Sequence, residues 1–246
     1  MTLLAPQAVL WDMDGTIVDT EPYWLAAEAA LVTEFGGSWS HEQAMQLVGS
    51  GLEDAARVFQ EAGVRMGVRE IIDHLTEGVM SRVAEEGPIF RPGALELLRS
   101  VRDAGIPTAL VTMSMRTMAV GIVDLIDFDA FDLVLGGDDV PRPKPFPDPY
   151  LRAAELLNVD IAQCVAIEDS PNGMRSAVAS GAATLGVSHM VSLEGTHAHA
   201  QWPTLAGRTA ADLSELLADF TAKRAETQTR ASAAHPADDA KNDEQK

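Results

Sequence analysis

The feature that most constrains the fold of this chain is a set of five short apolar runs, at residues 8–12, 107–112, 133–137, 164–169 and 183–187. Each run is continuously apolar instead of alternating, which is typical of a strand covered on both faces of a parallel sheet. Helical patterns flank and separate the later runs, at residues 92–104, 115–125, 149–157, 171–180 and 210–222. This alternation predicts an α/β fold with a parallel-sheet core and helices on both faces.

One long interval interrupts this alternation. More than 90 residues separate the first run from the second, and most of them have helical patterns. These patterns lie at residues 22–35, 41–48, 52–62 and 68–84, with glycines between them. We therefore expect a small helical domain, residues 19–87, inserted into a core made of residues 1–18 and 88–220.

The charge of the chain limits its partners. The formal net charge is −19, and the five basic and five acidic residues of positions 221–246 cancel, so the excess belongs to the body of the protein. Such a charge argues against binding to nucleic acid or to an anionic membrane surface. An anionic substrate would need a local positive site, such as a metal ion. Residues 221–246 are polar and are expected to be disordered.

The single cysteine bears on the compartment. Cys164 lies in an apolar run, where it is expected to be a small buried apolar residue. One cysteine excludes a disulfide framework and favours a reducing, cytoplasmic location. We expect no signal peptide, because the N-terminus lacks a basic segment followed by a long apolar one. No run of about 18 apolar residues occurs, so no membrane span is expected either. As a separate expectation, a small acidic protein of this kind would be a monomer.

Polar side chains follow the predicted strands where these end. Asp12 and Asp14 come at the end of the first run, directly before Gly15. Aspartate and glycine are depleted in strands, so this pair is expected to serve chemistry more than packing. Ligands bind beyond the carboxyl ends of the strands in open α/β sheets, which predicts one site there. The other polar strand-end residues are Thr112, Ser114, Glu168 and Asp169.

Lys144 carries a separate signal. It is the only lysine before residue 223, and it lies in the proline-rich loop 141–147. The prolines restrict the loop and would fix the direction of the ammonium group, which as a compact charge suits contact with an oxyanion. A solvated surface lysine is the alternative.

Each strand-end group also has a structural alternative. Asp12 and Asp14 could form a turn and a helix cap, and Thr112 could be an ordinary β-branched strand residue. Glu168 and Asp169 could cap the helix expected from residue 171, and for Ser114 helix capping is about as good an explanation as phosphate contact. A calcium loop that begins at Asp12 is excluded, because no glutamate stands at its twelfth position.

Together these segments resemble, in order and spacing, the four motifs of the haloacid dehalogenase superfamily: Asp12-Met13-Asp14-Gly15-Thr16, Val111-Thr112-Met113-Ser114, Lys144, and Ile167-Glu168-Asp169-Ser170. The resemblance covers about residues 6–220. The inserted helical domain looks like the cap of subfamily I, and the branch most similar to the chain contains β-phosphoglucomutases and sugar-phosphate phosphatases. The resemblance implies a Rossmann-like core and a Mg²⁺-dependent enzyme acting on a small phosphorylated metabolite.

The resemblance also implies roles for individual residues. Asp12 would be the nucleophile that forms an aspartyl-phosphate and a metal ligand, and Asp14 would be the general acid and base. The metal would also be held by Asp169, by the backbone oxygen of Asp14 and, through water, by Glu168. The phosphate would be held by Lys144, by Thr112 and by backbone N–H groups near Met13 and Asp14; Met113 and Ser114 complete this expected phosphate site.

Several activities of the superfamily are disfavoured by single residues. Dehalogenases do not need the second aspartate, which is present here as Asp14, and phosphonatases need a cap lysine, which is absent here. The mutases carry a histidine and a cap arginine where this chain has Trp24 and Leu52, so we favour a phosphatase over a sugar-phosphate mutase. A catalytically silent phosphosugar-binding module is disfavoured, because both aspartates are retained.

The cap gives weaker signals. Trp24, Gly49 and Gly51 are candidate specificity residues that would line a pocket for a neutral sugar or polyol, although core packing explains Trp24 nearly as well. His197 and His199 lie two residues apart in a polar segment. We expect both histidines to be solvated, because no further Cys or His cluster completes a metal site.

Overall fold

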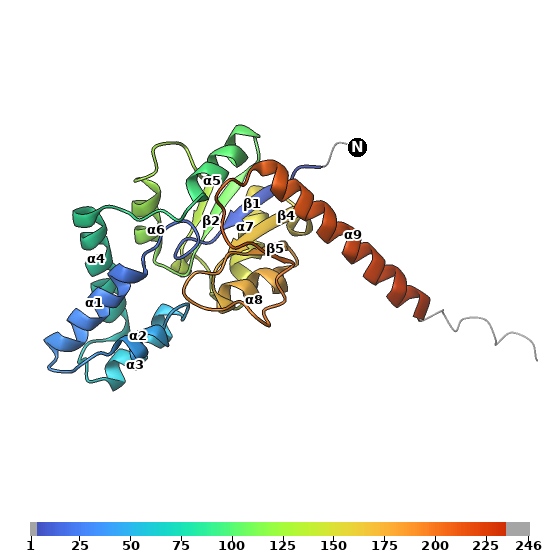
Figure 1. Cartoon of the computed structure of the whole chain (residues 1–246). Coiled ribbons are helices and arrows are strands. Elements are labelled where there is room, and N and C mark those ends of the chain that lie inside the picture. Colours follow the sequence, from blue (N-terminus) through green and yellow to red (C-terminus); the bar gives the residue numbers. More distant parts are fainter. Residues whose placement is uncertain (1–3, 235–246) are drawn as a thin grey trace, which may run out of the picture.

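The computed structural model describes residues 4–234 and contains a six-stranded, wholly parallel sheet with the strand order β3-β2-β1-β4-β5-β6 (Figure 1). The strands are β1 (Ala8–Trp11), β2 (Thr108–Val111), β3 (Leu133–Leu135), β4 (Cys164–Glu168), β5 (Ala183–Gly186) and β6 (Ala200–Gln201). β1 lies in the centre, between β2 and β4. All strands run the same way, so their carboxyl ends meet at one edge of the sheet.

Helices cover both faces of this sheet. They are α5 (Ala94–Asp103), α6 (Arg116–Val123), α7 (Asp148–Leu157), α8 (Pro171–Ser180) and α9 (Ala210–Ala234), with the short 3₁₀ helices η1 (Gly137–Asp139) and η2 (Ile161–Gln163). Val9 and Trp11 of β1 pack with α5, α6 and α9. Ala8 and Leu10 point to the opposite face and pack with α7 and α8, because successive strand residues alternate between faces. The predicted fold class is confirmed.

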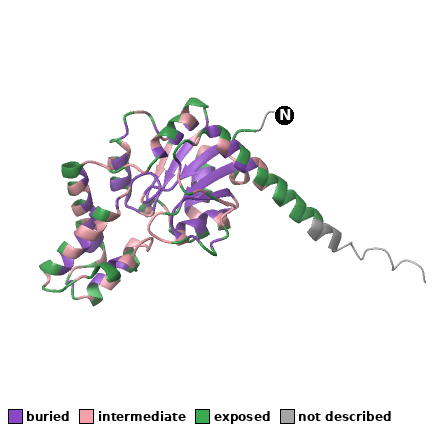
Figure 2. Ribbon diagram, in the orientation of Figure 1, coloured by how far each residue is buried: buried purple, intermediate pink, exposed green. Residues whose placement is uncertain are grey.

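The position of β1 in the sheet explains why its sequence does not alternate between apolar and polar residues. All four residues of β1 are buried, and Figure 2 shows the sheet buried between its two helical layers. Burial of a large apolar side chain such as Leu10 contributes about 1.5–3 kcal/mol. A strand in this position must therefore be apolar on both sides, as the continuous runs indicated.

The interval between β1 and β2 forms a second, helical unit beside the sheet (Figure 1). Its helices are α1 (Glu21–Glu34), α2 (His41–Met45), α3 (Leu52–Glu61) and α4 (Val68–Glu86). α1 and α3 both pack against α4, and the Trp39 and Phe59 rings lie 5.0 Å apart between their centroids. Ser40 caps α2 by accepting from the Gln43 N–H. We call this unit the cap; its boundaries at residues 19 and 87 stay a prediction.

Two chain segments connect the cap to the core, and they pair with each other. Val18 forms an antiparallel bridge with Phe90. The backbone N–H of Asp19 donates to the oxygen of Ile89 at 2.7 Å, and the N–H of Arg91 donates to the oxygen of Ile17 at 2.8 Å. These paired connections, residues 17–19 and 89–91, are called the linker ribbon below.

Two elements differ from the prediction. β6 has only two residues and no apolar run, so periodicity could not reveal it. The expectation of disorder from residue 221 is wrong as far as Ala234, where α9 ends; residues 235–246 lie outside the described part. Residues 221–229 are exposed (Figure 2), but six of these nine residues are alanine, lysine, arginine, glutamate or glutamine, which favour helix without a core. Lys223 also pairs with Asp219 at 2.7 Å.

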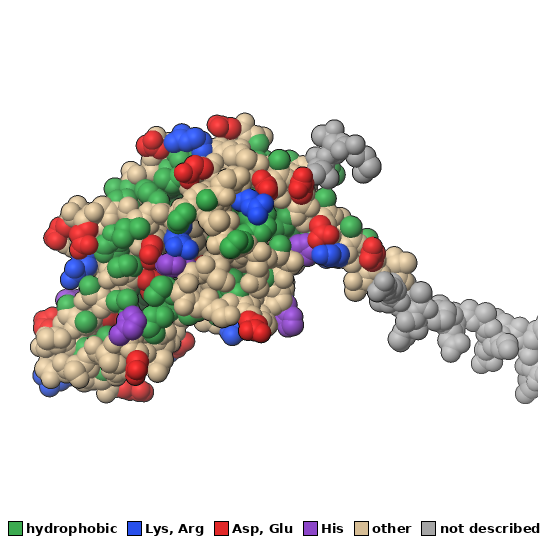
Figure 3. Space-filling view, viewed as in Figure 1, with side chains coloured by type: hydrophobic (Ala, Val, Ile, Leu, Met, Phe, Trp, Pro, Cys, Tyr) green, Lys and Arg blue, Asp and Glu red, His purple; other side chains and the backbone are tan. Residues whose placement is uncertain are grey.

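The surface gives two further observations. Among helices within residues 4–234, none has both the length and the apolar character that crossing a bilayer requires. On the face drawn in Figure 3, basic side chains lie among acidic ones. Typical pairs are Arg57 with Asp54 at 2.9 Å and Arg69 with Asp73 at 2.8 Å.

Candidate active site

The structure brings the predicted strand-end residues together at the carboxyl edge of the sheet. Asp12 directly follows β1, Thr112 follows β2, and Asp169 follows β4. Lys144 comes from the loop between β3 and α7 and reaches the same place. Parallel pairing produces this convergence, because β1 lies between β2 and β4 with Trp11 opposite Leu110 and Ile167.

Lys144 lies at the centre of an ion-pair network. Its Nζ atom is 2.6 Å from Oδ1 of Asp12 and 2.6 Å from Oε1 of Glu168. The residue is 3% exposed, so the alternative of a solvated surface lysine is wrong. Burial lowers the pKa of this ammonium group, but Asp12 and Glu168 raise it further, so the pKa of Lys144 is raised overall and the group stays charged.

Three buried carboxylates surround this single ammonium group. Asp12, Glu168 and Asp169 each place one oxygen within 4.8 Å of the others. Burial, and then the neighbouring Glu168 charge, raise the pKa of Asp12 to about 7, although Lys144 opposes the shift. Burial, followed by Asp12, also raises the pKa of Asp169 well above its ordinary value. When all three carboxylates are ionised, the cluster therefore holds more negative charge than the single ammonium group of Lys144 neutralises.

The cluster fits a hard cation. The carboxylate of Asp169 accepts no hydrogen bond from residues 4–234 and faces the backbone of Gly15, where a Cβ atom would lie 2.0 Å from Oδ2. Gly15 has a φ of +80°, a conformation that glycine adopts readily. Oxygen donors at this spacing and an uncompensated negative charge suit Mg²⁺, so Asp12, Asp169 and Glu168 could hold this ion.

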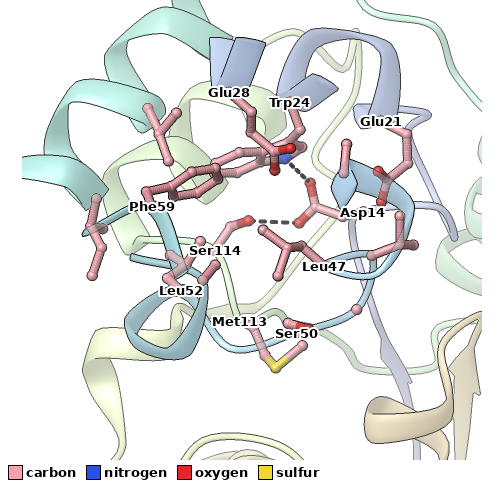
Figure 4. A pocket seen from close by; sticks show the side chains of 16 residues that line it. Asp14, Glu21, Trp24, Glu28, Leu47, Ser50, Leu52, Phe59, Met113 and Ser114 are labelled. Atoms are coloured by element: carbon pink, nitrogen blue, oxygen red, sulfur yellow. Dashed lines mark hydrogen bonds between the residues drawn. The ribbon is translucent and has the colours of Figure 1, made fainter. Parts of the chain in front are cut away.

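Asp14 has a different environment from Asp12. Its Oδ2 atom accepts from the hydroxyl groups of Thr112 at 3.1 Å and Ser114 at 2.7 Å. Its Oδ1 atom accepts from the Thr20 hydroxyl and from Nε1 of Trp24 at 3.5 Å. The two aspartates therefore have different partners. Asp12 belongs to the charged cluster, whereas Asp14 accepts hydrogen bonds from neutral donors and faces the cap (Figure 4).

The hydroxyl groups of Thr112 and Ser114 both donate to Asp14 in this structure, and their contact with phosphate stays a prediction. The Thr112 hydroxyl also accepts from the Ser114 N–H at 3.0 Å. The backbone N–H groups of Met13 and Asp14 donate to no atom of residues 4–234, so both stay available to an oxyanion.

A cavity lies between Asp14 and the cap helices, and Figure 4 shows its lining. Trp24 and Gly49 line it, whereas Gly51 lines the adjacent cleft that leads to Lys144. Met113 lines both. The cap loop is tied to the core, since Nδ2 of Asn172 donates to the backbone oxygen of Gly49 at 2.9 Å. The candidate cap residues thus lie beside the charged site.

The comparison with known proteins decides the family. The family model of the haloacid dehalogenase-like hydrolases matches residues 9–187, which contain all the strand-end residues described above. The chain belongs to this family.

Relatives of this hydrolase include Hexitol phosphatase B of Escherichia coli (strain K12), 30% identical over 171 residues that cover 68% of this chain and 77% of that protein. The Phosphoglycolate phosphatase of Neisseria meningitidis is 32% identical over 196 residues, covering 74% and 80%. The crystal structure of CbbY from Rhodobacter sphaeroides in complex with phosphate has a TM-score of 0.74 at 25% identity, covering 82% of this chain and 96% of that one. β-Phosphoglucomutase from Clostridium difficile shares the fold, with a TM-score of 0.76 at 20% identity, covering 88% and 99%.

Some residues of the hydrolase site were missed by the sequence analysis. The Tyr150 hydroxyl donates to Oε1 of Glu168 at 2.6 Å, from the buried face of α7. Thr20 bonds Asp14, and Glu28 lines the cap cavity. Thr20 directly precedes α1, where a threonine in the sequence would suggest a helix cap and not a contact to Asp14, and a tyrosine on an apolar helix face gives no signal at all.

The remaining predictions concern single residues of the hydrolase. Cys164 is buried, as expected, and burial raises the pKa of its thiol to about 12. The expectation that His199 is solvated is wrong: its Nε2 lies 3.1 Å from Asp219, and its ring packs edge-on to Phe220. Both partners lie on α9, within the part of this helix that the sequence predicted, and the prediction did not foresee that the segment after β5 packs against it.

Proposed function

We propose that this hydrolase is a phosphatase that cleaves a small phosphate monoester, of a sugar or a polyol, through an aspartyl-phosphate intermediate. The observation that carries the proposal is the different environment of the two neighbouring aspartates. Asp12 lies 2.6 Å from Lys144 inside the charged cluster, whereas Asp14 is held by hydroxyl donors at the cap cavity. Such a division suits one carboxylate as nucleophile and the other as proton carrier.

In the first step, an oxygen of Asp12 attacks phosphorus, and the bond from phosphorus to the alcohol oxygen breaks. Asp14 in its protonated form gives its proton to that leaving oxygen, so the alcohol departs neutral. Lys144 offsets the negative charge of the phosphoryl group, and the free N–H groups of Met13 and Asp14 offer donors to its oxygens. Positioning and charge stabilisation of this kind dominate phosphoryl transfer.

In the second step, water attacks the phosphorus of the aspartyl-phosphate and inorganic phosphate leaves. The Asp14 carboxylate takes a proton from that water and returns to its acid form, ready for another cycle. Thr112, Met113 and Ser114 surround this reaction; the two hydroxyl groups hold Asp14 in place and can turn toward phosphate when it is bound.

We assign Mg²⁺ as the metal, held by Asp12, Asp169 and, through water, Glu168, with the backbone oxygen of Asp14. When bound, the ion supplies a positive charge that polarises the phosphoryl group. Three carboxylates within 4.8 Å and one ammonium group support this assignment. A cytoplasmic location and a monomeric state, both expected from the sequence, remain predictions.

Release of inorganic phosphate from a panel of sugar and polyol phosphates tests the proposal, with and without EDTA. We expect turnover that EDTA abolishes and Mg²⁺ restores, and no turnover by Asp12→Asn. Metal-independent turnover, or full activity of that variant, would contradict the mechanism. β-Glucose 1-phosphate distinguishes the mutase alternative, because a mutase would accumulate glucose 6-phosphate without free phosphate.

A further inference from the structure

The cap cavity has an unusual charge. Three of its lining residues are carboxylic acids, Asp14, Glu21 and Glu28, and its lining contains no lysine, arginine or histidine. Its other walls are mostly apolar and aromatic, among them Trp24 and Phe59. A cavity of this composition can receive a polar group but offers no basic side chain to an anion.

Glu28 is the least solvent-exposed of these three acids. Glu21, Trp24 and Glu28 follow a spacing of three and four residues, so α1 presents them on one face, and Figure 4 shows all three at the cavity. Glu28 is 7% exposed. Its Oε2 atom accepts from Nε1 of Trp39 at 3.1 Å, whereas Oε1 receives no hydrogen bond from residues 4–234. One oxygen is therefore fixed and the other is available to a ligand.

Burial makes the ionised form of Glu28 energetically unfavourable when no ligand donates a hydrogen bond to it. It raises the pKa of Glu28 to about 7, although the Trp39 bond opposes the shift. Burial, and then the nearby Asp14 charge, raise the pKa of Glu21 to about 8. A hydrogen-bond donor from a ligand would stabilise the buried carboxylate, whereas an anionic group in the same cavity would add repulsion in a poorly solvated place.

The adjacent cleft does not provide an unengaged basic side chain for an anionic substrate group either. Arg69 lines it, but its guanidinium group is engaged by Asp73 at 2.8 Å. Glu53, Asp54 and Asp138 line the same cleft. Lys144 is bound to two carboxylates and serves the phosphoryl group in the proposed mechanism.

Resting on the phosphatase function proposed above, we infer that Glu28 determines specificity for the alcohol part of the ester. Its Oε1 atom accepts a hydrogen bond from a hydroxyl or ammonium group of that part. The cavity thereby excludes esters that carry a carboxylate or a second phosphate at the same end. Trp39 acts as a positioning residue, because it holds Oε2 without lining the cavity.

The test uses three open-chain esters that differ only at the carbon furthest from phosphate: glucitol 6-phosphate (hydroxyl), glucamine 6-phosphate (ammonium) and 6-phosphogluconate (carboxylate). We expect kcat/KM for 6-phosphogluconate to be lower than for both others by about 10-fold or more, since hydrogen bonds to charged groups and unpaired buried charges have this size of effect. p-Nitrophenyl phosphate reports on the chemistry alone.

Two variants locate the effect. Glu28→Gln keeps the shape and the Trp39 bond but removes the charge, so the disadvantage of 6-phosphogluconate relative to glucitol 6-phosphate should shrink by about 10-fold. Trp39→Phe should weaken the same discrimination. Glu34→Gln is the matched control, because Glu34 lies exposed on the same helix. Each ratio is measured within one protein, so a partly unfolded preparation does not alter it.

The outcomes separate the two proposals. No phosphate release from any compound, p-nitrophenyl phosphate included, would contradict the phosphatase function itself. Hydrolysis of p-nitrophenyl phosphate together with equal use of 6-phosphogluconate and glucitol 6-phosphate would overturn the role of Glu28. Failure to use any of the three six-carbon esters, or unchanged ratios in Glu28→Gln and Trp39→Phe, would overturn it as well.

Discussion

The backbone of Gly15 packs so closely against the Asp169 carboxylate that a Cβ atom at position 15 would lie 2.0 Å from Oδ2. The turn after β1 and the end of β4 are therefore fitted to each other without space for a side chain. Position 15 thus contacts one member of the acid cluster, so any displacement of Asp169 would change the proposed metal site.

This contact predicts the effect of Gly15→Ala. The substitution meets both a positive φ and a clash, so phosphate release should fall by at least 100-fold and Mg²⁺ should bind more weakly in a calorimetric titration. Gly36→Ala is the control, because Gly36 has a φ of +81° and nothing within 4 Å of its added Cβ. The control should cost only about 1–2 kcal/mol of unfolding free energy and no activity. Equal activity losses in both variants would contradict the role of the Asp169 contact.

Lys144→Met tests the ion-pair network. Removing the ammonium group leaves the buried carboxylates of Asp12 and Glu168 without their cation, which typically costs about 3–5 kcal/mol. Urea unfolding in EDTA should detect this loss, and phosphate release should disappear. Lys223→Met removes a lysine from an exposed pair with Asp219 and should change stability by less than about 1 kcal/mol. A stability loss no greater than that of the control would contradict the network.

The acid role of Asp14 predicts a dependence on the leaving group. Asp14→Asn should slow the cleavage of a sugar phosphate by about 10²–10⁴-fold, the usual contribution of general acid catalysis. p-Nitrophenol needs little protonation when it leaves, so its release in single-turnover measurements should fall far less. Equal losses for both compounds would exclude Asp14 as the acid.

The buried Glu28 predicts a pH dependence of stability. Its pKa is raised from 4.5 to about 7, so between these values the folded protein keeps a proton that the unfolded chain has lost. Stability therefore declines as pH rises through this window. The decline should be shallower in Glu28→Gln, whereas Glu34→Gln should follow the wild type. Urea unfolding at half-unit steps from pH 4.5 to 8 measures both slopes; parallel curves for Glu28→Gln and wild type would refute the assignment.

The sequence was most informative where polar groups end apolar strands. Asp12, Thr112 and Asp169 could be brought to one site from the geometry of a parallel sheet, because strand direction alone determines which ends meet. Lys144 was identified by its isolation in a rigid loop, and the structure gives it two carboxylate partners. Local pattern and sheet topology thus sufficed for the core of the site.

Contacts between distant helix faces could not be predicted in this way. Tyr150 reaches Glu168 from an apolar face of α7, and a tyrosine there has the same pattern as a core residue. Glu28 is buried and accepts a hydrogen bond from Trp39, and both features depend on how the cap helices pack. The exposed part of α9 was missed for the opposite reason: composition measures the capacity to form a core, whereas that segment needs only local helix propensity.

The linker ribbon has a mechanical consequence. Because residues 17–19 and 89–91 are hydrogen-bonded to each other, the cap is joined to the core by a paired band instead of two independent tethers. Such a two-stranded connection bends more easily out of its plane than within its plane. Any tilt of the cap would therefore bend both connections together, and it would lengthen the contact that Trp24 makes with Asp14 across this junction.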